Sequence, residues 1–151
     1  MEGYKVVEHF VSINGEAQAA GELACFIRFA GCNLNCSYCD TKWANTDTVS
    51  YQIMCAEEIC DHIRATGVKN VTLTGGEPLL YPEFRTLYLE LRKMGMIVTI
   101  NTNGTLIDEE WADFFGKNRP RRINITLYGA SEETYRNLCH FPEGYERTLR
   151  G

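Results

Sequence analysis

The chain has 151 residues, 15 of them basic and 20 acidic, so its formal net charge is −5. With 44% apolar and 23% charged residues, the composition suits one globular domain over residues 1–151 and excludes a disordered or fibrous chain. The acidic balance argues against nucleic acid as a partner, and no apolar run approaches the roughly 20 residues of a membrane span, so we expect a cytoplasmic protein with no membrane contact.

Strands and helices are predicted to alternate from residue 23 onward. A strand over 23–30 leads into a polar loop, and an amphipathic helix follows from Ile53 to a cap at Gly67. A strand over 71–74 then breaks at a glycine pair, and a second helix covers 84–94. Each apolar run is short and is bounded by glycine or polar residues, which is typical of an alternating α/β chain.

The second half of the chain repeats this alternation. A strand over 96–100 precedes a helix capped by Asp108, and a strand over 123–127 precedes a helix that begins at Ser131. A further strand is predicted over 4–13. Alternating units of this kind form a parallel sheet with helices packed outside it, so the fold class is α/β. Its functional residues are expected where the strands end.

Three of the seven cysteines stand close together, with the spacing C-x3-C-x2-C at Cys32, Cys36 and Cys39. The odd total of seven cysteines and their uneven spacing along the chain argue against a disulfide framework. Soft thiolates suit an iron–sulfur cluster or zinc, and three ligands would leave one iron of a cubane cluster open. The alternatives are three surface cysteines, or a zinc site completed by His62 or Cys60. The remaining cysteines are expected to pack singly as small apolar side chains, at positions Cys25, Cys55, Cys60 and Cys139.

The cysteine motif, on the loop after a strand, resembles that of the radical S-adenosylmethionine (SAM) superfamily. The resemblance implies a partial (βα) barrel, here apparently truncated to about four βα units, with the C-terminal strands absent. It also implies a 4Fe-4S cluster whose open iron is chelated by SAM. Reductive cleavage of SAM in that family produces a 5′-deoxyadenosyl radical that removes a hydrogen atom from the substrate.

Two later polar segments resemble SAM-binding motifs of the same family. One is the segment 101–104, Asn-Thr-Asn-Gly, which resembles the polar end of the family's third strand. The segment 74–78, Thr-Gly-Gly-Glu-Pro, resembles its GGE motif, because glycines let the backbone approach a ligand and a carboxylate suits an ammonium group. The alternative for each segment is an ordinary turn. The resemblance implies SAM contacts at Tyr38, Cys39, Asp40, Gly75, Gly76, Glu77, Asn101 and Asn103. Further contacts from the fourth strand and helix, at Asn124, Thr126 and Ser131, compete with plain sheet polarity and a helix cap.

The segments 10–16, 26–34 and 39–41 resemble the 7-carboxy-7-deazaguanine synthase family. That family converts 6-carboxy-5,6,7,8-tetrahydropterin to 7-carboxy-7-deazaguanine in the queuosine pathway, as a magnesium-dependent carbon–nitrogen lyase. The resemblance implies that Thr41 ligates magnesium through its hydroxyl oxygen. It also implies a pterin site made by Ile13, Asn14, Gly15, Glu16, Arg28 and Thr74. The arginine fork suits a carboxylate, with a structural ion pair as the alternative.

Other functions remain open at this stage. Residues 123–135, with Gly144–Arg147, resemble radical SAM enzymes that modify peptides or proteins, and the short length is also that of a radical SAM activase. A third alternative is a non-catalytic iron–sulfur-binding fragment. The resemblance implies an electron donor such as flavodoxin or ferredoxin, and a homodimer is one possible assembly.

Overall fold

The computed structural model describes residues 3–15 and 20–151. Its strands form one six-stranded sheet in the order β3-β1-β2-β4-β5-β6. Strands β2, β4, β5 and β6 run parallel, and β1 pairs antiparallel with both β2 and β3. The strands are β1 (Tyr4–Ile13), β2 (Leu23–Phe29), β3 (Gln52–Met54), β4 (Asn70–Gly75), β5 (Ile97–Thr102) and β6 (Arg122–Ile125).

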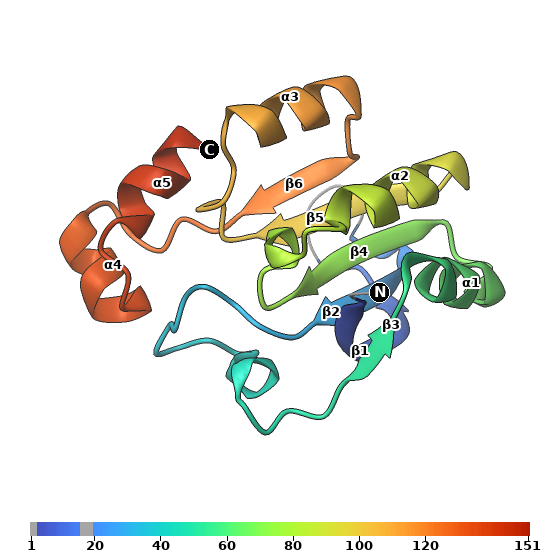
Figure 1. Ribbon diagram of the computed structural model, residues 1–151, viewed down its shortest axis with the longest axis horizontal. Helices are drawn as coiled ribbons and strands as arrows, with labels where there is room; N and C mark the ends of the chain where they lie inside the picture. Colours follow the sequence, from blue (N-terminus) through green and yellow to red (C-terminus); the bar gives the residue numbers. More distant parts are fainter. Residues whose placement is uncertain (1–2, 16–19) are drawn as a thin grey trace.

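Helices α1 to α3 cover one face of this sheet, and α4 and α5 lie beyond the ends of β5 and β6 (Figure 1). The helices are α1 (Ala56–Thr66), α2 (Phe84–Lys93), α3 (Glu109–Lys117), α4 (Glu132–Cys139) and α5 (Gly144–Arg150), with short 3-10 turns η2 (Lys42–Asn45) and η3 (Pro78–Leu80). None of the helices in the described ranges is long and apolar enough to cross a bilayer.

The two faces of the sheet differ in chemistry because side chains alternate along each strand. Ile27, Leu73 and Ile100 are almost completely buried and pack in one core beneath α1, α2 and α3. The residues that alternate with them, including Arg28 and Thr74, face the other side, where these two are register partners. The apolar face therefore holds the fold together, and the polar face is free to line a site.

Caps end or begin the helices where the sequence predicts them. Gly67 takes a left-handed conformation (φ 70°) after α1. The Asp108 side chain accepts a hydrogen bond from the Trp111 amide at the start of α3, and Ser131 does the same for Thr134 at the start of α4. These contacts satisfy amides that no helical carbonyl reaches.

Three local predictions need correction. Ile53 lies on the edge strand β3 and not on α1, which begins three residues later behind a capping box formed by Cys55 and Glu58. A three-residue strand is too short to show its own periodicity, so the sequence pattern merged it with the helix. Strand β6 ends at Ile125, short of the predicted residue 127, and α5 was not predicted as a helix.

Candidate radical SAM active site

A cavity of about 390 Å³ opens at the carboxyl ends of the parallel strands, on the polar face of the sheet. Its walls come from β2, β4, β5, the segments that follow β2 and β4, and residues at and after β6. The structure brings most of the predicted site residues to these walls, namely Arg28, Cys32, Cys36, Cys39, Asp40, Thr41, Thr74, Gly75, Gly76, Asn101 and Asn103.

The cysteine loop after β2 is held in place by helix α4. The Asn35 amide donates to the Cys139 carbonyl (3.2 Å), and the Ser37 amide donates to the Leu138 carbonyl (2.9 Å). Leu34 and Cys36 pack in a small buried cluster with Tyr135 and Cys139. Cys139 is completely buried in this cluster, as expected of a cysteine that packs as a small apolar side chain, and it lies beside the three-cysteine motif.

The three thiols share a partly buried environment. Burial raises the pKa of Cys32, while hydrogen bonds from the Leu34 amide and Asn103 oppose the rise. Burial, followed by the neighbouring Cys139, raises the pKa of Cys36 to about 12. Cys32 and Cys36 therefore need a nearby cation to be held as thiolates, and three cysteine sulfurs around one cavity suit a soft iron–sulfur cluster. The donor set therefore fits a cluster with three protein ligands.

The glycine pair after β4 lies against the base of the cysteine loop. The Gly76 amide donates to the Phe29 carbonyl (2.9 Å), and the Glu77 amide donates to the Gly31 carbonyl (2.8 Å). Gly75 has φ 114°, and a β-carbon added to it would lie 2.4 Å from the Phe29 nitrogen. The glycines are thus required by the close contact of two backbone segments, and both also line the cavity.

The Glu77 carboxylate is completely buried and is not part of the cavity wall in the described chain. It accepts hydrogen bonds from the Leu79 amide (3.0 Å), the Thr102 hydroxyl (2.7 Å) and the Asn103 amide (2.7 Å). Burial raises the pKa of Glu77, and these three donors oppose the rise. These bonds join the glycine turn to the end of β5, and the contact with the SAM ammonium group that the sequence motif predicts stays a prediction.

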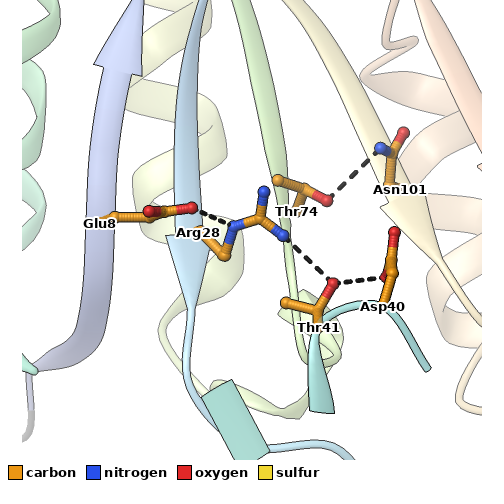
Figure 2. Close-up of polar contacts among 6 residues, drawn as sticks. All are labelled: Glu8, Arg28, Asp40, Thr41, Thr74 and Asn101. Atoms are coloured by element: carbon orange, nitrogen blue, oxygen red, sulfur yellow. Dashed lines mark hydrogen bonds and ion pairs between the residues drawn. The ribbon is translucent and has the colours of Figure 1, made fainter. Parts of the chain in front are cut away.

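A chain of polar contacts crosses the cavity floor from β1 to the cysteine loop (Figure 2). The Nε of Arg28 donates to Oε1 of Glu8 (2.6 Å), and its Nη1 donates to the Thr41 hydroxyl (3.1 Å). The Thr41 hydroxyl in turn donates to Oδ1 of Asp40 (2.7 Å). Arg28 therefore forms the structural ion pair that was the alternative to substrate binding, and it also lines the cavity.

A second polar chain crosses β4, β5 and β6. The Nδ2 of Asn124 donates to Oδ1 of Asn101 (2.9 Å), and the Nδ2 of Asn101 contacts the Thr74 hydroxyl (3.4 Å; Figure 2 shows this second contact). Asn124 and Thr126 also line the cavity, while Ser131 caps α4 and is not among the lining residues. These hydroxyl and amide groups can both donate and accept, which suits a polar organic ligand.

Some predicted site residues lie elsewhere. Tyr38 is 51% exposed, contacts the ring of Tyr128 (centroids 5.8 Å apart) and does not line the cavity in the described chain. Ile13 pairs with Leu23 at the amino end of β2, opposite the end that leads into the cavity, and Asn14 and Gly15 follow it. Glu16 lies outside the described residues. The substrate contacts expected of Ile13, Asn14, Gly15 and Glu16 therefore stay predictions.

Among the residues at or beside the site that were not predicted, Glu8 and Asn45 bear directly on its chemistry. Glu8 fixes Arg28, and a register shift between Val6 and Glu8, which the sequence does not indicate, brings it opposite Arg28 in the β1–β2 pair. Asn45 lines the cavity, and its Oδ1 is buried with no hydrogen-bond partner among the described residues. An unpaired buried carbonyl can accept from a ligand, but nothing in the local sequence distinguishes Asn45 from an ordinary loop residue.

Several proteins similar in sequence to this chain are 7-carboxy-7-deazaguanine synthases. The 7-carboxy-7-deazaguanine synthase of Clostridium acetobutylicum is 50% identical over 141 residues, which are 91% of this chain and 62% of that protein. The 7-carboxy-7-deazaguanine synthase of Methanothermobacter thermautotrophicus is 42% identical over 103 residues, 67% of this chain and 41% of that protein. The chain thus spans less than two thirds of the length of these relatives.

The fold comparison agrees with the sequence comparison. The crystal structure of QueE from Escherichia coli superposes with a TM-score of 0.62 at 27% identity, over 70% of this chain and 55% of that one. The six-stranded, mostly parallel sheet is consistent with the partial barrel that the sequence predicts. Residues 26–151 match the family model of the radical SAM superfamily, and they contain the three cysteines, strands β4 to β6 and the end of β2 that leads into the cavity. The chain belongs to the radical SAM superfamily.

Proposed function

We propose that the chain carries the core of a 7-carboxy-7-deazaguanine synthase, which converts 6-carboxy-5,6,7,8-tetrahydropterin to 7-carboxy-7-deazaguanine. The observation that carries the proposal is Arg28, a cation in the wall of the same cavity as the three cysteines. The 50% identity to the Clostridium acetobutylicum synthase over 91% of this chain supports the same substrate.

Superfamily membership implies a 4Fe-4S cluster and SAM, which together supply the radical chemistry when bound. Cys32, Cys36 and Cys39 would hold the cluster. SAM would be held by groups that line the same space, namely the backbone of Gly75 and Gly76, the Asn101 amide and the Asn45 carbonyl, which has no hydrogen-bond partner among the described residues. Both groups would then lie at the strand ends, over the polar face of the sheet.

The substrate would lie near Arg28. Glu8 occupies Nε and Thr41 occupies Nη1, so in the described chain Nη2 is the guanidinium nitrogen left without a partner. A substrate carboxylate can accept from Nη2 in a charge-assisted hydrogen bond, and the Glu8 contact holds the planar fork in one orientation. Thr74, the register partner of Arg28, offers a hydroxyl beside it.

Magnesium is part of the proposal, with Thr41 as its ligand. The Thr41 hydroxyl is buried and hydrogen-bonded to the Asp40 carboxylate, and both residues line the cavity. Hydroxyl and carboxylate oxygens are hard donors of the kind that magnesium takes. A divalent cation here would also offset the negative charges of Asp40 and the substrate carboxylate.

The decisive experiment supplies the pterin to anaerobically reconstituted, reduced protein with SAM and magnesium, and looks for the deazaguanine by mass. We expect the product together with 5′-deoxyadenosine. If SAM is cleaved and the pterin is untouched, a peptide- or protein-modifying function or an activase replaces this proposal. If SAM is also untouched, the non-catalytic alternative stands. Flavodoxin and ferredoxin are the proposed electron donors, and gel filtration of the same sample tests a homodimer.

A further inference from the structure

The three cysteines of the motif differ in their hydrogen bonds. The Sγ of Cys32 accepts from the Leu34 amide (3.4 Å) and from Nδ2 of Asn103 (3.7 Å). Within residues 3–15 and 20–151, Sγ of Cys36 and of Cys39 accepts no such bond. Of the three cysteines, Cys32 is thus the one whose sulfur accepts from N–H donors in the described chain, and one of these donors is the Asn103 side chain.

The orientation of the Asn103 amide follows from its other partners. Its Oδ1 accepts from the Thr105 amide (2.9 Å) and from the Thr105 hydroxyl (2.7 Å). A backbone amide can only donate, so Oδ1 must face Thr105 and Nδ2 must face Cys32. Nδ2 also donates to Oδ1 of Asn33 (2.9 Å), and Asn33 donates to the Thr105 hydroxyl (2.8 Å), which closes a ring of contacts.

The backbone at Asn103 is fixed by the buried Glu77 carboxylate. The Asn103 amide donates to Oε2 of Glu77 (2.7 Å), and the Thr102 hydroxyl donates to Oε1 of the same carboxylate (2.7 Å). Asn103 and Thr105 are each only 5% exposed. Asn103 therefore has little freedom to turn toward a ligand in the cavity without breaking several buried hydrogen bonds.

We propose that Asn103 is a positioning residue of the cluster: its side chain donates to the Cys32 thiolate and thereby raises the reduction potential of the iron–sulfur site. The reduced cluster carries one more negative charge than the oxidised one, so an N–H donor at a ligand sulfur stabilises the reduced state more. This role differs from the SAM contact that the sequence predicts for Asn103. It rests on the cluster that superfamily membership implies and not on the identity of the substrate.

The test is a potentiometric titration of the full chain with dithionite, without SAM, followed by the electron paramagnetic resonance signal of the reduced cluster. One electron from dithionite reduces each cluster. Asn103→Ala should shift the midpoint potential downward relative to the wild type. Asn101→Ala is the matched control, because Asn101 lines the same cavity and its amide contacts Thr74 and Asn124 but no sulfur. Its midpoint should stay at the wild-type value.

A second variant guards against failure of the first to fold or load iron. Asn103→Asp keeps the side-chain volume and the acceptor toward Thr105, but it has no Nδ2 donor and adds a negative charge, so its midpoint should fall further than that of Asn103→Ala. Wild-type midpoints in both Asn103 variants would overturn the proposal, and an equal fall in the Asn101 control would do so too. A wild-type midpoint combined with weaker SAM binding in Asn103→Ala would return Asn103 to the SAM site. None of these outcomes depends on turnover of the pterin.

Discussion

A β-carbon on Gly76 would lie 1.7 Å from the carbonyl oxygen of Gly31. The turn after β4 and the base of the cysteine loop are thus in direct backbone contact, with the Glu77 amide hydrogen-bonded to that same carbonyl. Nothing larger than glycine fits between them. The glycine pair consequently fixes the position of the cysteine loop even before any ligand binds.

Gly76→Ala should therefore destabilise the protein in the absence of cluster and SAM. Because the obstacle is backbone, we expect a loss of about 3 kcal/mol in the free energy of unfolding, the upper end of ordinary overpacking. Thermal denaturation of the apoprotein measures it. Gly116→Ala is the control, since an added β-carbon at this exposed helical site meets no heavy atom within 4 Å. Equal stability of the two variants would contradict the proposed packing role.

The second prediction concerns the cysteines. Changing Cys32, Cys36 or Cys39 to Ala should abolish the iron content and brown absorption after anaerobic reconstitution, because each supplies one thiolate. Cys60→Ala and Cys139→Ala should keep about four irons per chain, the stoichiometry of a cubane cluster. Cys139→Ala should lower the melting temperature as well, since it removes a buried side chain beside Cys36. If Cys139 proves as necessary for iron as Cys36, the three-ligand site is wrong.

Glu77→Gln should cost about 1–3 kcal/mol of stability, because its amide nitrogen replaces one of the two carboxylate oxygens, and Oε1 accepts from Thr102 while Oε2 accepts from Asn103. The pH dependence should change as well. Burial raises the pKa of Glu77, so above the ordinary value of 4.5 the native state holds a proton that the unfolded chain has lost. This extra proton means that the stability of the folded state falls as pH rises from 4.5, until the folded-state pKa of Glu77 has been passed.

Denaturant unfolding between acidic and neutral pH measures this difference. The wild type should lose stability with rising pH more steeply than Glu77→Gln, which lacks the titrating group. Parallel pH profiles would refute the burial argument. A variant that folds with wild-type stability but binds SAM more weakly would place the carboxylate at the ligand, as the sequence motif predicts.

Arg28→Lys should raise the KM for the pterin by roughly tenfold to a hundredfold, the equivalent of one charge-assisted hydrogen bond. Lysine keeps the charge but lacks the planar fork that contacts both Glu8 and Thr41. Steady-state kinetics with varied pterin measures the change, and SAM binding serves as the control that should stay at the wild-type level. An unchanged KM would leave Arg28 as a purely structural partner of Glu8.

Thr41→Val keeps the shape of the side chain and removes its oxygen. We expect any stimulation of product formation by magnesium to disappear, while cleavage of SAM without substrate continues, because the cluster ligands are untouched. Activity measured across a magnesium titration provides the comparison. Undiminished magnesium stimulation in this variant would assign the ion to another ligand.

Several features of the fold could be predicted because they depend on neighbours in the chain. The alternation of short apolar runs with helical patterns predicted the parallel strands and the helices between them, and caps such as Asp108 marked where helices begin. The spacing of the three cysteines likewise predicted that they share one site, and the structure places all three on one cavity.

Glu8 shows what such local patterns miss. Val6 faces the core, so simple alternation would turn Glu8 toward the core as well. A shift of register between Val6 and Glu8 adds one residue and reverses the faces, which brings Glu8 opposite Arg28. No residue type in the segment announces that irregularity. The contact of Cys139 with the cysteine loop depends in the same way on tertiary packing between residues about a hundred positions apart.

The two hydrogen bonds that join the cysteine loop to the end of α4 have a consequence for biosynthesis. A ribosome releases the chain from the amino end, so the three thiols emerge long before Leu138 and Cys139, whose carbonyls accept from Ser37 and Asn35 respectively. During translation the nascent loop lacks its anchor, and its thiols are open to oxidation. Iron–sulfur assembly is accordingly expected to follow translation of α4, and a chain that stalls before this helix should not retain the metal.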